Sequence, residues 1–239
     1  GVARAFVNNQ RGGNTQGAST LTMQYVRQVV SYSAKTPSEV FAFLFTAPEA
    51  GANRAVIQDL MGVTLRDAGY GFAGGMVAAV AVAILFVLFR SVEQALMPIA
   101  MLLRSVPLVA MTPIIVLIAG RGVGGVAIIA GIVVFFPALV TIVFGLRSVG
   151  AGARDLVVAY GGSEATVLRK VAFPTALPAI FAAARISVPG ALIGALVAEW
   201  LATGGGIGGQ IQRDPVQFKY TEIWAMIAVL TAVSIILYT

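Results

Sequence analysis

The stretch Asp155–Pro178, DLVVAYGGSEATVLRKVAFPTALP, is the one charged interruption in an otherwise apolar second half of the chain. Two short helices are predicted on either side of Gly161–Gly162, because Ser163 can cap the second helix and Glu164 lies in its first turn. The basic pair Arg169–Lys170 falls in the last turn of that helix, which is the charge order that a helix dipole favours. A polar helix pair between uncharged segments indicates contact with a soluble partner at a membrane face. A membrane-surface loop with no partner is the alternative.

The composition favours a membrane protein. The chain has 239 residues, of which 58% are hydrophobic and 11% charged, whereas a soluble domain carries about 25% charged residues. It contains no cysteine and no histidine, so no disulfide framework, catalytic thiolate or imidazole, metal site or cofactor is expected. The net charge of +6 comes from Lys and Arg at the ends of apolar runs. This pattern is typical of membrane proteins, and no basic stripe with interleaved aromatic residues indicates nucleic-acid binding.

Five long apolar runs predict an all-α fold, a polytopic membrane helix bundle with five spans. The runs are Phe72–Phe89, Ser105–Gly120, Gly122–Leu146, Val171–Ala198 and Ile223–Thr239. The segment Arg90–Arg104 is predicted to form an amphipathic helix between the first two spans. Phe41–Phe45 is too short to cross a bilayer and is expected to form an interfacial or packing helix. Two small-xxx-small pairs, Gly71 with Gly75 and Gly190 with Gly194, predict close helix packing.

The distribution of basic residues predicts the orientation. Five spans place six basic residues on one side and three on the other, so the Asp155–Pro178 loop is expected in the cytoplasm and the N-terminal head outside. The six are Arg90, Arg104, Arg147, Arg154, Arg169 and Lys170, and the three are Arg121, Arg213 and Lys219.

The loop resembles the cytoplasmic signature of bacterial ABC importer permeases. That signature runs Glu-Ala-Ala, three residues, Gly, nine residues, Ile, any residue, Leu-Pro. Asp155 takes the Glu position, Leu156–Val157 the Ala pair, Gly161 the Gly and Val171–Pro174 the final group. The spacing is kept, while the acid is shortened and the apolar identities differ.

Three flanking stretches are similar to the nitrate, sulfonate, taurine and bicarbonate branch of that family: Arg104–Gly122, Phe135–Val149 and Ala198–Gly208. The resemblance covers residues 36–239. It implies the transmembrane permease subunit of an ATP-driven importer for a small, anionic solute such as a sulfonate, nitrate or taurine. The partners it implies are a cytoplasmic ATP-binding subunit, a second permease subunit in a homodimer, an extracytoplasmic solute-binding protein and the lipid of the plasma membrane. The family has a further span before Phe72 and continues past the final helix, so the chain is expected to lack the first span and to be truncated at its C-terminus.

Permeases of this kind do no covalent chemistry and work by alternating access, so the chain is not expected to be an enzyme. The resemblance implies that the loop couples the permease to the ATPase, with Gly161 permitting the sharp turn. The implied coupling residues are Arg154, Asp155, Gly161, Gly162, Glu164, Arg169, Val171, Pro174 and Pro178. Ordinary helix-start chemistry is the alternative role for these residues.

Two charged residues in the fourth run, Arg185 and Glu199, are candidates for the solute pathway. The alternatives are snorkelling of Arg185 to the cytoplasmic headgroups and a plain surface position for Glu199. The run Gly204–Gly209 lacks the Lys-Ser/Thr pair of a phosphate-binding loop. It is expected to be a flexible loop near the docking surface for a solute-binding protein.

The polar segment Gly1–Lys35 differs from the rest of the chain. Within it, Gly17–Gln24 resembles a motif of the peptidoglycan glycosyltransferase domain of class A penicillin-binding proteins. The segment is too short to bury a core and lacks the family's catalytic Glu, so it is expected to be a remnant rather than a folded domain. A membrane-anchored peptidoglycan glycosyltransferase, and a channel or transporter not driven by ATP, are the alternative functions.

Overall fold

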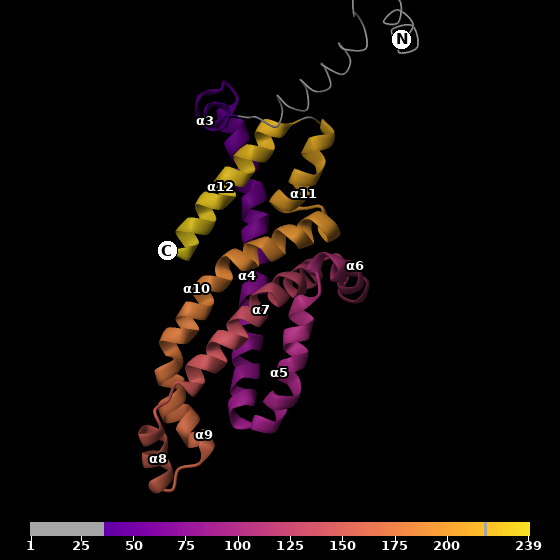
Figure 1. Ribbon diagram of the computed structural model, residues 1–239. Coiled ribbons are helices and arrows are strands. Elements are labelled where there is room, and N and C mark those ends of the chain that lie inside the picture. The colour runs from indigo at the N-terminus through magenta and orange to yellow at the C-terminus, as the bar shows by residue number, and fades with distance from the viewer. Residues whose placement is uncertain (1–35, 218) are drawn as a thin grey trace, which may run out of the picture.

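A computed structural model describes residues 36–217 and 219–239, and every regular element in that part of the chain is helical (Figure 1). The all-α prediction is therefore confirmed. The interpretation of Gly1–Lys35 as a glycosyltransferase remnant lies outside the described residues. The elements are α3 (Pro37–Phe41), η1 (Ala42–Thr46), α4 (Ala50–Leu88), α5 (Arg90–Ser105), α6 (Leu108–Ala119), α7 (Val123–Arg147), α8 (Ala151–Ala159), α9 (Glu164–Val167), η2 (Leu168–Ala172), α10 (Phe173–Ala198), η3 (Glu199–Thr203), α11 (Gly206–Arg213), η4 (Asp214–Gln217) and α12 (Tyr220–Tyr238).

Four helical segments of the described chain are long and apolar enough to cross a membrane. They are α4, α7, the continuous helix Glu164–Thr203 and α12. A fifth span arises if α5 and α6, which are bent by 107° at their junction, count as one crossing. The predicted second span Ser105–Gly120 is wrong as a single straight span, because α6 has 12 residues. Such a helix is about 18 Å long, well short of the ~30 Å hydrocarbon core.

The helix that contains the predicted first span begins much earlier than the apolar run Phe72–Phe89. Helix α4 starts at Ala50 rather than near Phe72 and runs for 39 residues, or about 58 Å. Its N-terminal half carries charged residues that end an apolar run but do not end a helix. The Phe41–Phe45 segment forms the packing helix that was expected. Its carbonyl groups accept hydrogen bonds from Asn53 (3.1 Å) and Arg54 (2.7 Å) at the start of α4.

The core is the contact of α4, α7 and α10, and small residues set its spacing. A Cβ atom added at Gly75 of α4 would lie 2.7 Å from the Gly131 carbonyl oxygen of α7. Gly71 of α4 and Gly194 of α10 both lie against Ala130 of α7, which is fully buried. The predicted close packing at both glycine pairs is confirmed, since Gly190 also meets α7. Lipid supplies no hydrophobic drive between helices, so backbone proximity and van der Waals contact hold this core together.

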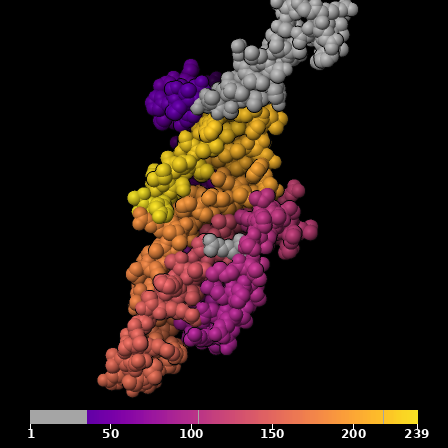
Figure 2. All heavy atoms as spheres, viewed as in Figure 1, coloured from indigo at the N-terminus to yellow at the C-terminus, as the bar shows by residue number. Residues whose placement is uncertain are grey.

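The molecule is elongated, and its two ends differ. Helices α8 and α9 lie at one end, where α7 ends and α10 begins, while α3 and α11 lie toward the other end (Figure 1). The space-filling view shows α8 and α9 as the extremity of the molecule (Figure 2). Helix α5 is the separate amphipathic helix that was predicted, and it runs back beside α4 from Arg90.

Candidate functional site

The two predicted helices of the Asp155–Pro178 loop are present as α8 and α9, and they meet at Gly161–Gly162. Gly161 has φ +81, a left-handed conformation that favours glycine. Gly162 donates a hydrogen bond to the Val157 carbonyl oxygen (2.9 Å), and a Cβ at Gly162 would lie 2.8 Å from that oxygen. Both glycines are therefore required for the tight reversal between the helices.

The start of α9 follows the predicted capping chemistry. The Ser163 hydroxyl accepts a hydrogen bond from the Thr166 N–H (3.4 Å), and Glu164 lies in the first turn. The predicted helix end at Arg169–Lys170 is wrong, because these residues lie in the π-helical turn η2 and the helix continues into α10. A π turn often accommodates a defect in the hydrogen-bond ladder, and here it ends two residues before Pro174, which has no N–H to donate.

An ion pair joins the two short helices: Arg154 of α8 contacts Glu164 of α9. The hydrogen bond to Glu164, together with its charge, raises the pKa of Arg154 above its ordinary value. Both side chains are more than half exposed, so the pair contributes little to stability. Asp155, Arg169 and Lys170 are also exposed. These five charged groups are available to a partner at this end of the molecule.

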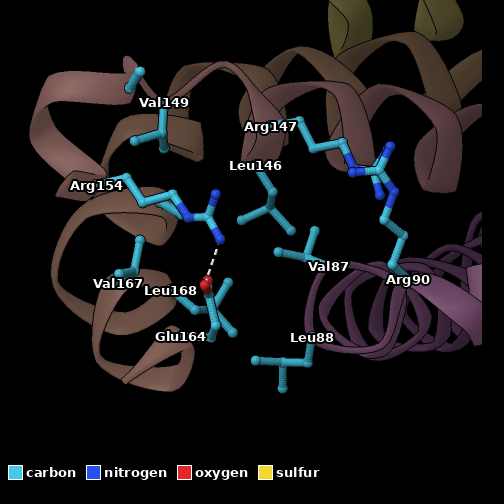
Figure 3. Close-up of a pocket in the computed structure, with 12 residues that line it drawn as sticks. Val87, Leu88, Arg90, Leu146, Arg147, Val149, Arg154, Glu164, Val167 and Leu168 are labelled. Carbon is cyan, nitrogen blue, oxygen red and sulfur yellow. Dashed lines mark hydrogen bonds and ion pairs between the residues drawn. The ribbon is translucent and has the colours of Figure 1, made fainter. Parts of the chain in front are cut away.

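A cavity of about 590 Å³ lies between α8–α9 and the ends of α4 and α7 (Figure 3). It is lined by Val87, Leu88, Arg90, Leu146, Arg147, Val149, Ala151, Arg154, Glu164, Val167, Leu168 and Ala172. The lining includes three arginines and one glutamate: Arg154 contacts Glu164, while Arg90 and Arg147 lie on the other side of the cavity (Figure 3). Arg147 also pairs with Glu93 of α5, whereas Arg90 has no ion-pair partner among the described residues. The cavity between α8–α9 and the ends of α4 and α7 therefore carries a net positive charge, and most of its other lining residues are apolar.

Sequence reasoning missed the residues that pack α9 onto the bundle. Val167 and Ala172 are buried, and Ala172 belongs to the core formed by α4, α7 and α10. Val171 is only half-buried, and Pro174 and Pro178 are exposed. The π turn shifts which residues face inward, so an apolar pattern read with an unbroken 3.6-residue period does not identify them.

The two pathway candidates do not form one site. Arg185 donates hydrogen bonds to the carbonyl oxygens of Tyr238 (2.5 Å) and Thr239 (3.0 Å) at the end of α12. Glu199 lies 14 residues further along the same helix, about 21 Å away. The surface alternative for Glu199 is wrong, because this residue is fully buried.

The glycine-rich run is also more ordered than expected. Helix α11 begins at Gly206, and Gly206–Gly209 are buried, so the prediction of a flexible loop is wrong. Only Gly204 and Gly206 have positive φ values in this run, +69 and +58. The turn packs against Glu199, which explains its small residues.

The comparisons with known proteins agree with this architecture. A family model described as "Binding-protein-dependent transport system inner membrane component" matches residues 35–239. A probable ABC transporter permease protein of Haemophilus influenzae is 29% identical over 176 residues, which are 74% of this chain and 72% of the relative. The formylaminopyrimidine transport permease protein ThiX of Halalkalibacterium halodurans is 29% identical over 173 residues, 72% of this chain and 69% of the relative. A putative aliphatic sulfonates transport permease protein, SsuC of Bacillus subtilis, is 29% identical over 160 residues, 67% of this chain and 58% of the relative.

These relatives are all transport permeases, so the resemblance of Gly17–Gln24 to penicillin-binding proteins gains no support from them. The glycosyltransferase alternative is not favoured for the same reason. The family match spans the four apolar helices, the bent pair and the α8–α9 reversal. The chain therefore belongs to the family of inner membrane components of binding-protein-dependent transport systems, and it is a multi-pass membrane permease of the ABC transporter type.

Proposed function

We propose that this chain is the membrane-spanning permease subunit of an ATP-driven importer, and that α8 and α9 form its coupling site for a cytoplasmic ATP-binding subunit. The coupling site comprises Arg154, Asp155, Gly161, Gly162, Glu164, Arg169, Val171, Pro174 and Pro178. The observation that carries the proposal is the rigid reversal at Gly161–Gly162, which presents exposed charges at the extremity of a chain of this family.

The connection of α9 to α10 supports a mechanical role. The segment Glu164–Thr203 is one continuous helix of 40 residues, and Val167 and Ala172 anchor its first turns in the bundle. A displacement of α9 by a partner would therefore move α10 with it. Rocking of packed helices around a central pathway is how transporters of many folds alternate access.

The proposed cytoplasmic position of the coupling site rests on the resemblance of this loop to the cytoplasmic signature of ABC importer permeases. Arg90, Arg147, Arg154, Arg169 and Lys170 lie near the end of the molecule that carries α8 and α9. Arg104 lies in the last turn of α5, away from Arg90, so the predicted six-to-three ratio of basic residues becomes five to four and does not decide the orientation. The opposite end, with α11, would then face the extracytoplasmic solute-binding protein. Residues 36–239 would form one permease domain that pairs with a second permease subunit.

The proposed solute is a small organic molecule. The names of the relatives include a nitrogen heterocycle and aliphatic sulfonates, so a small organic solute is the class that covers both. The narrower expectation of an anion rests on the resemblance to the sulfonate branch. Arg185, the cation suggested for an anion pathway, is engaged by the end of α12 in this structure.

Reconstitution tests the proposal. The full chain should co-purify with an ATP-binding subunit from the same genome, and proteoliposomes containing both should take up solute only with ATP and a loaded binding protein. Uptake driven by an ion gradient without ATP would instead support the transporter or channel alternative. Competition by an alkyl sulfonate or by an aminopyrimidine then distinguishes the two solute classes.

A further inference from the structure

Glu199 lies where three elements meet, and it is fully buried in η3. Its Oε2 atom accepts a hydrogen bond from the Thr64 hydroxyl of α4 (3.0 Å). The same oxygen accepts a second hydrogen bond from the Gly208 N–H of α11 (2.8 Å). One side chain at the end of the long helix therefore contacts both α4 and α11.

Thr64 extends this contact to a second amide of α11. Its hydroxyl accepts a hydrogen bond from the Ile207 N–H (3.0 Å) while it donates to Glu199. The N–H groups in the first turn of a helix have no partner within the helix and must find one elsewhere. Here the Glu199–Thr64 pair supplies the partners for Ile207 and Gly208.

The glycine-rich turn is shaped around the Glu199 side chain. A Cβ at Gly208 would lie 2.9 Å from the Glu199 Cβ, and a Cβ at Gly206 would overlap the Glu199 carboxyl group. Gly206 also has φ +58, a conformation that favours glycine. The glycine-rich turn and the Glu199 carboxyl group therefore fit each other closely. The proposed coupling site lies at the opposite end of the molecule and has no contact with them (Figure 1).

Hydrogen bonding, rather than ion pairing, accounts for the contacts of Glu199. Both donors to Oε2 are neutral, and among the described residues no cationic side chain bonds to the carboxyl group. An amide oxygen can accept the same two hydrogen bonds. Removal of the acceptor would leave buried donors without partners, which costs more than the bonds themselves contribute.

We propose that Glu199 is a positioning residue for transport: with Thr64, it holds the turn 204–209 and α11 against α4 and so fixes the shape of this end of the permease. The structural part stands on the contacts above. The transport part rests on the proposed function, in which this end receives solute from a binding protein.

A cysteine reporter tests the structural part, because the chain has no native cysteine. Ile207 is fully buried, so Ile207→Cys in the full-length chain should react slowly with a maleimide in proteoliposomes. Adding Glu199→Ala should accelerate labelling at least about tenfold, whereas Glu199→Gln should stay within about twofold of the parent. Thr64→Val, which keeps the carboxyl group, should accelerate labelling about threefold or more.

Thr112→Val is the matched control. Thr112 is also a buried threonine, but its hydroxyl bonds only to the Leu108 carbonyl oxygen in its own helix (3.0 Å). This variant should label at the parent rate. If Glu199→Ala fails to insert into the membrane, the labelling rates of the Thr64→Val and Thr112→Val variants are compared instead. Faster labelling of Thr64→Val supports the proposal, and equal rates contradict it. Equal rates for Glu199→Ala and the parent, or equally fast labelling of Glu199→Gln and Glu199→Ala, would overturn the proposal.

Uptake without the reporter tests the transport part. Glu199→Ala should lower binding-protein-dependent uptake at least about fivefold, while Glu199→Gln restores it and both variants still co-purify with the ATP-binding subunit. Normal uptake by a Glu199→Ala chain that labels rapidly would refute the positioning role. If the parent chain itself shows no uptake, the proposed function fails and the labelling result still decides whether the Glu199–Thr64 pair holds α11.

Discussion

At the residue scale, the left-handed backbone conformation of Gly161 sets the direction of α9, which belongs to the proposed coupling site. Its φ of +81 would strain any side chain by about 1–2 kcal/mol, yet no atom lies within 4 Å of an added Cβ. Gly161→Leu should therefore leave membrane insertion and abundance nearly normal. It should re-aim α9, so ATP-dependent uptake and transport-stimulated ATP hydrolysis should fall together when measured in proteoliposomes.

Gly152→Leu is the control for that experiment. Gly152 lies in α8 with ordinary helical geometry, and an added Cβ there also meets no atom within 4 Å. Transport by the Gly152→Leu variant should be closer to that of the parent than transport by the Gly161→Leu variant. Asp155→Lys should impair uptake without loss of abundance, because it reverses a charge on the coupling surface. Normal transport by Gly161→Leu would show that α8–α9 does not couple the permease to its ATPase.

Asp214 predicts a pH dependence of stability near α11. Burial, and then the charge of Glu222, raises the pKa of Asp214, so the folded state binds this proton more tightly than the unfolded state does. The contribution of Asp214 to stability is therefore fully present below its ordinary pKa of about 3.9 and is lost as the pH rises through the raised value. Thermal unfolding between pH 4 and pH 7 should show this decline, and Asp214→Asn should reduce it.

The geometry around Asp214 specifies what the variant keeps. Its Oδ1 accepts a hydrogen bond from the Gln210 side chain (2.6 Å), which an asparagine oxygen can also accept. Lys219 and Arg213 are the nearby cations, and both lower the pKa less than burial raises it. Asp155→Asn, at an exposed site on α8, is the comparison. A pH profile of the Asp214→Asn variant identical to that of the parent would contradict the assignment.

At the element scale, the approach of α4 to α7 depends on Gly75. A side chain there would meet the Gly131 carbonyl oxygen and Val134, so Gly75→Leu must separate the helices. Overpacking of this kind costs about 1–3 kcal/mol, and the yield and thermal stability in detergent should fall. Gly74→Leu is the neighbouring control, since an added Cβ at Gly74 has nothing within 4 Å. Equal stability of the two variants would contradict the packing described here.

The elements also show where sequence patterns succeed and fail. The start of α7 at Val123 lies within one residue of its predicted position, because a long uncharged run begins there. Helix α4 begins 22 residues before the predicted span, because an apolar run marks the part of a helix that lies in the membrane and not the whole helix. Arg54, Asp59 and Arg66 interrupt the apolar run, but they do not interrupt the backbone hydrogen bonds of the helix. The bend between α5 and α6 depends on how the helices pack, which no local pattern contains.

The same distinction applies to the candidate site. Gly161 and Ser163 were predictable, because a left-handed turn and a helix cap each require particular residue types. The basic cavity was not predictable, since Arg90, Arg147 and Arg154 come together only through the folding of α5, α7 and α8. Glu199 was recognised as unusual, but its burial depends on Thr64, which lies 135 residues away in the chain.

At the scale of the whole molecule, the proposed orientation places α8 and α11 on opposite sides of the membrane. A single cysteine at Ala153 in α8 or at Gln212 in α11 would be exposed in either case. In right-side-out vesicles, Gln212→Cys should react with a charged, membrane-impermeant maleimide. Ala153→Cys should react only after permeabilisation. The reverse labelling pattern would show that the orientation is opposite to the proposed one. The proposed coupling site would then lie outside the cell, where it could not contact a cytoplasmic ATP-binding subunit.

The position of Ala130, between Gly71 on one side and Gly194 on the other, restricts how the sequence can drift over evolution. In most cores, a larger residue can be accommodated by a second-site change that makes its neighbour smaller. Here both neighbours are already glycine, so no compensating substitution of that kind exists for either contact. Glycine is the only smaller residue that residue 130 could become, and a library of variants should recover almost nothing else at that position. The centre of the bundle should therefore tolerate less sequence variation than the surfaces that contact its partners.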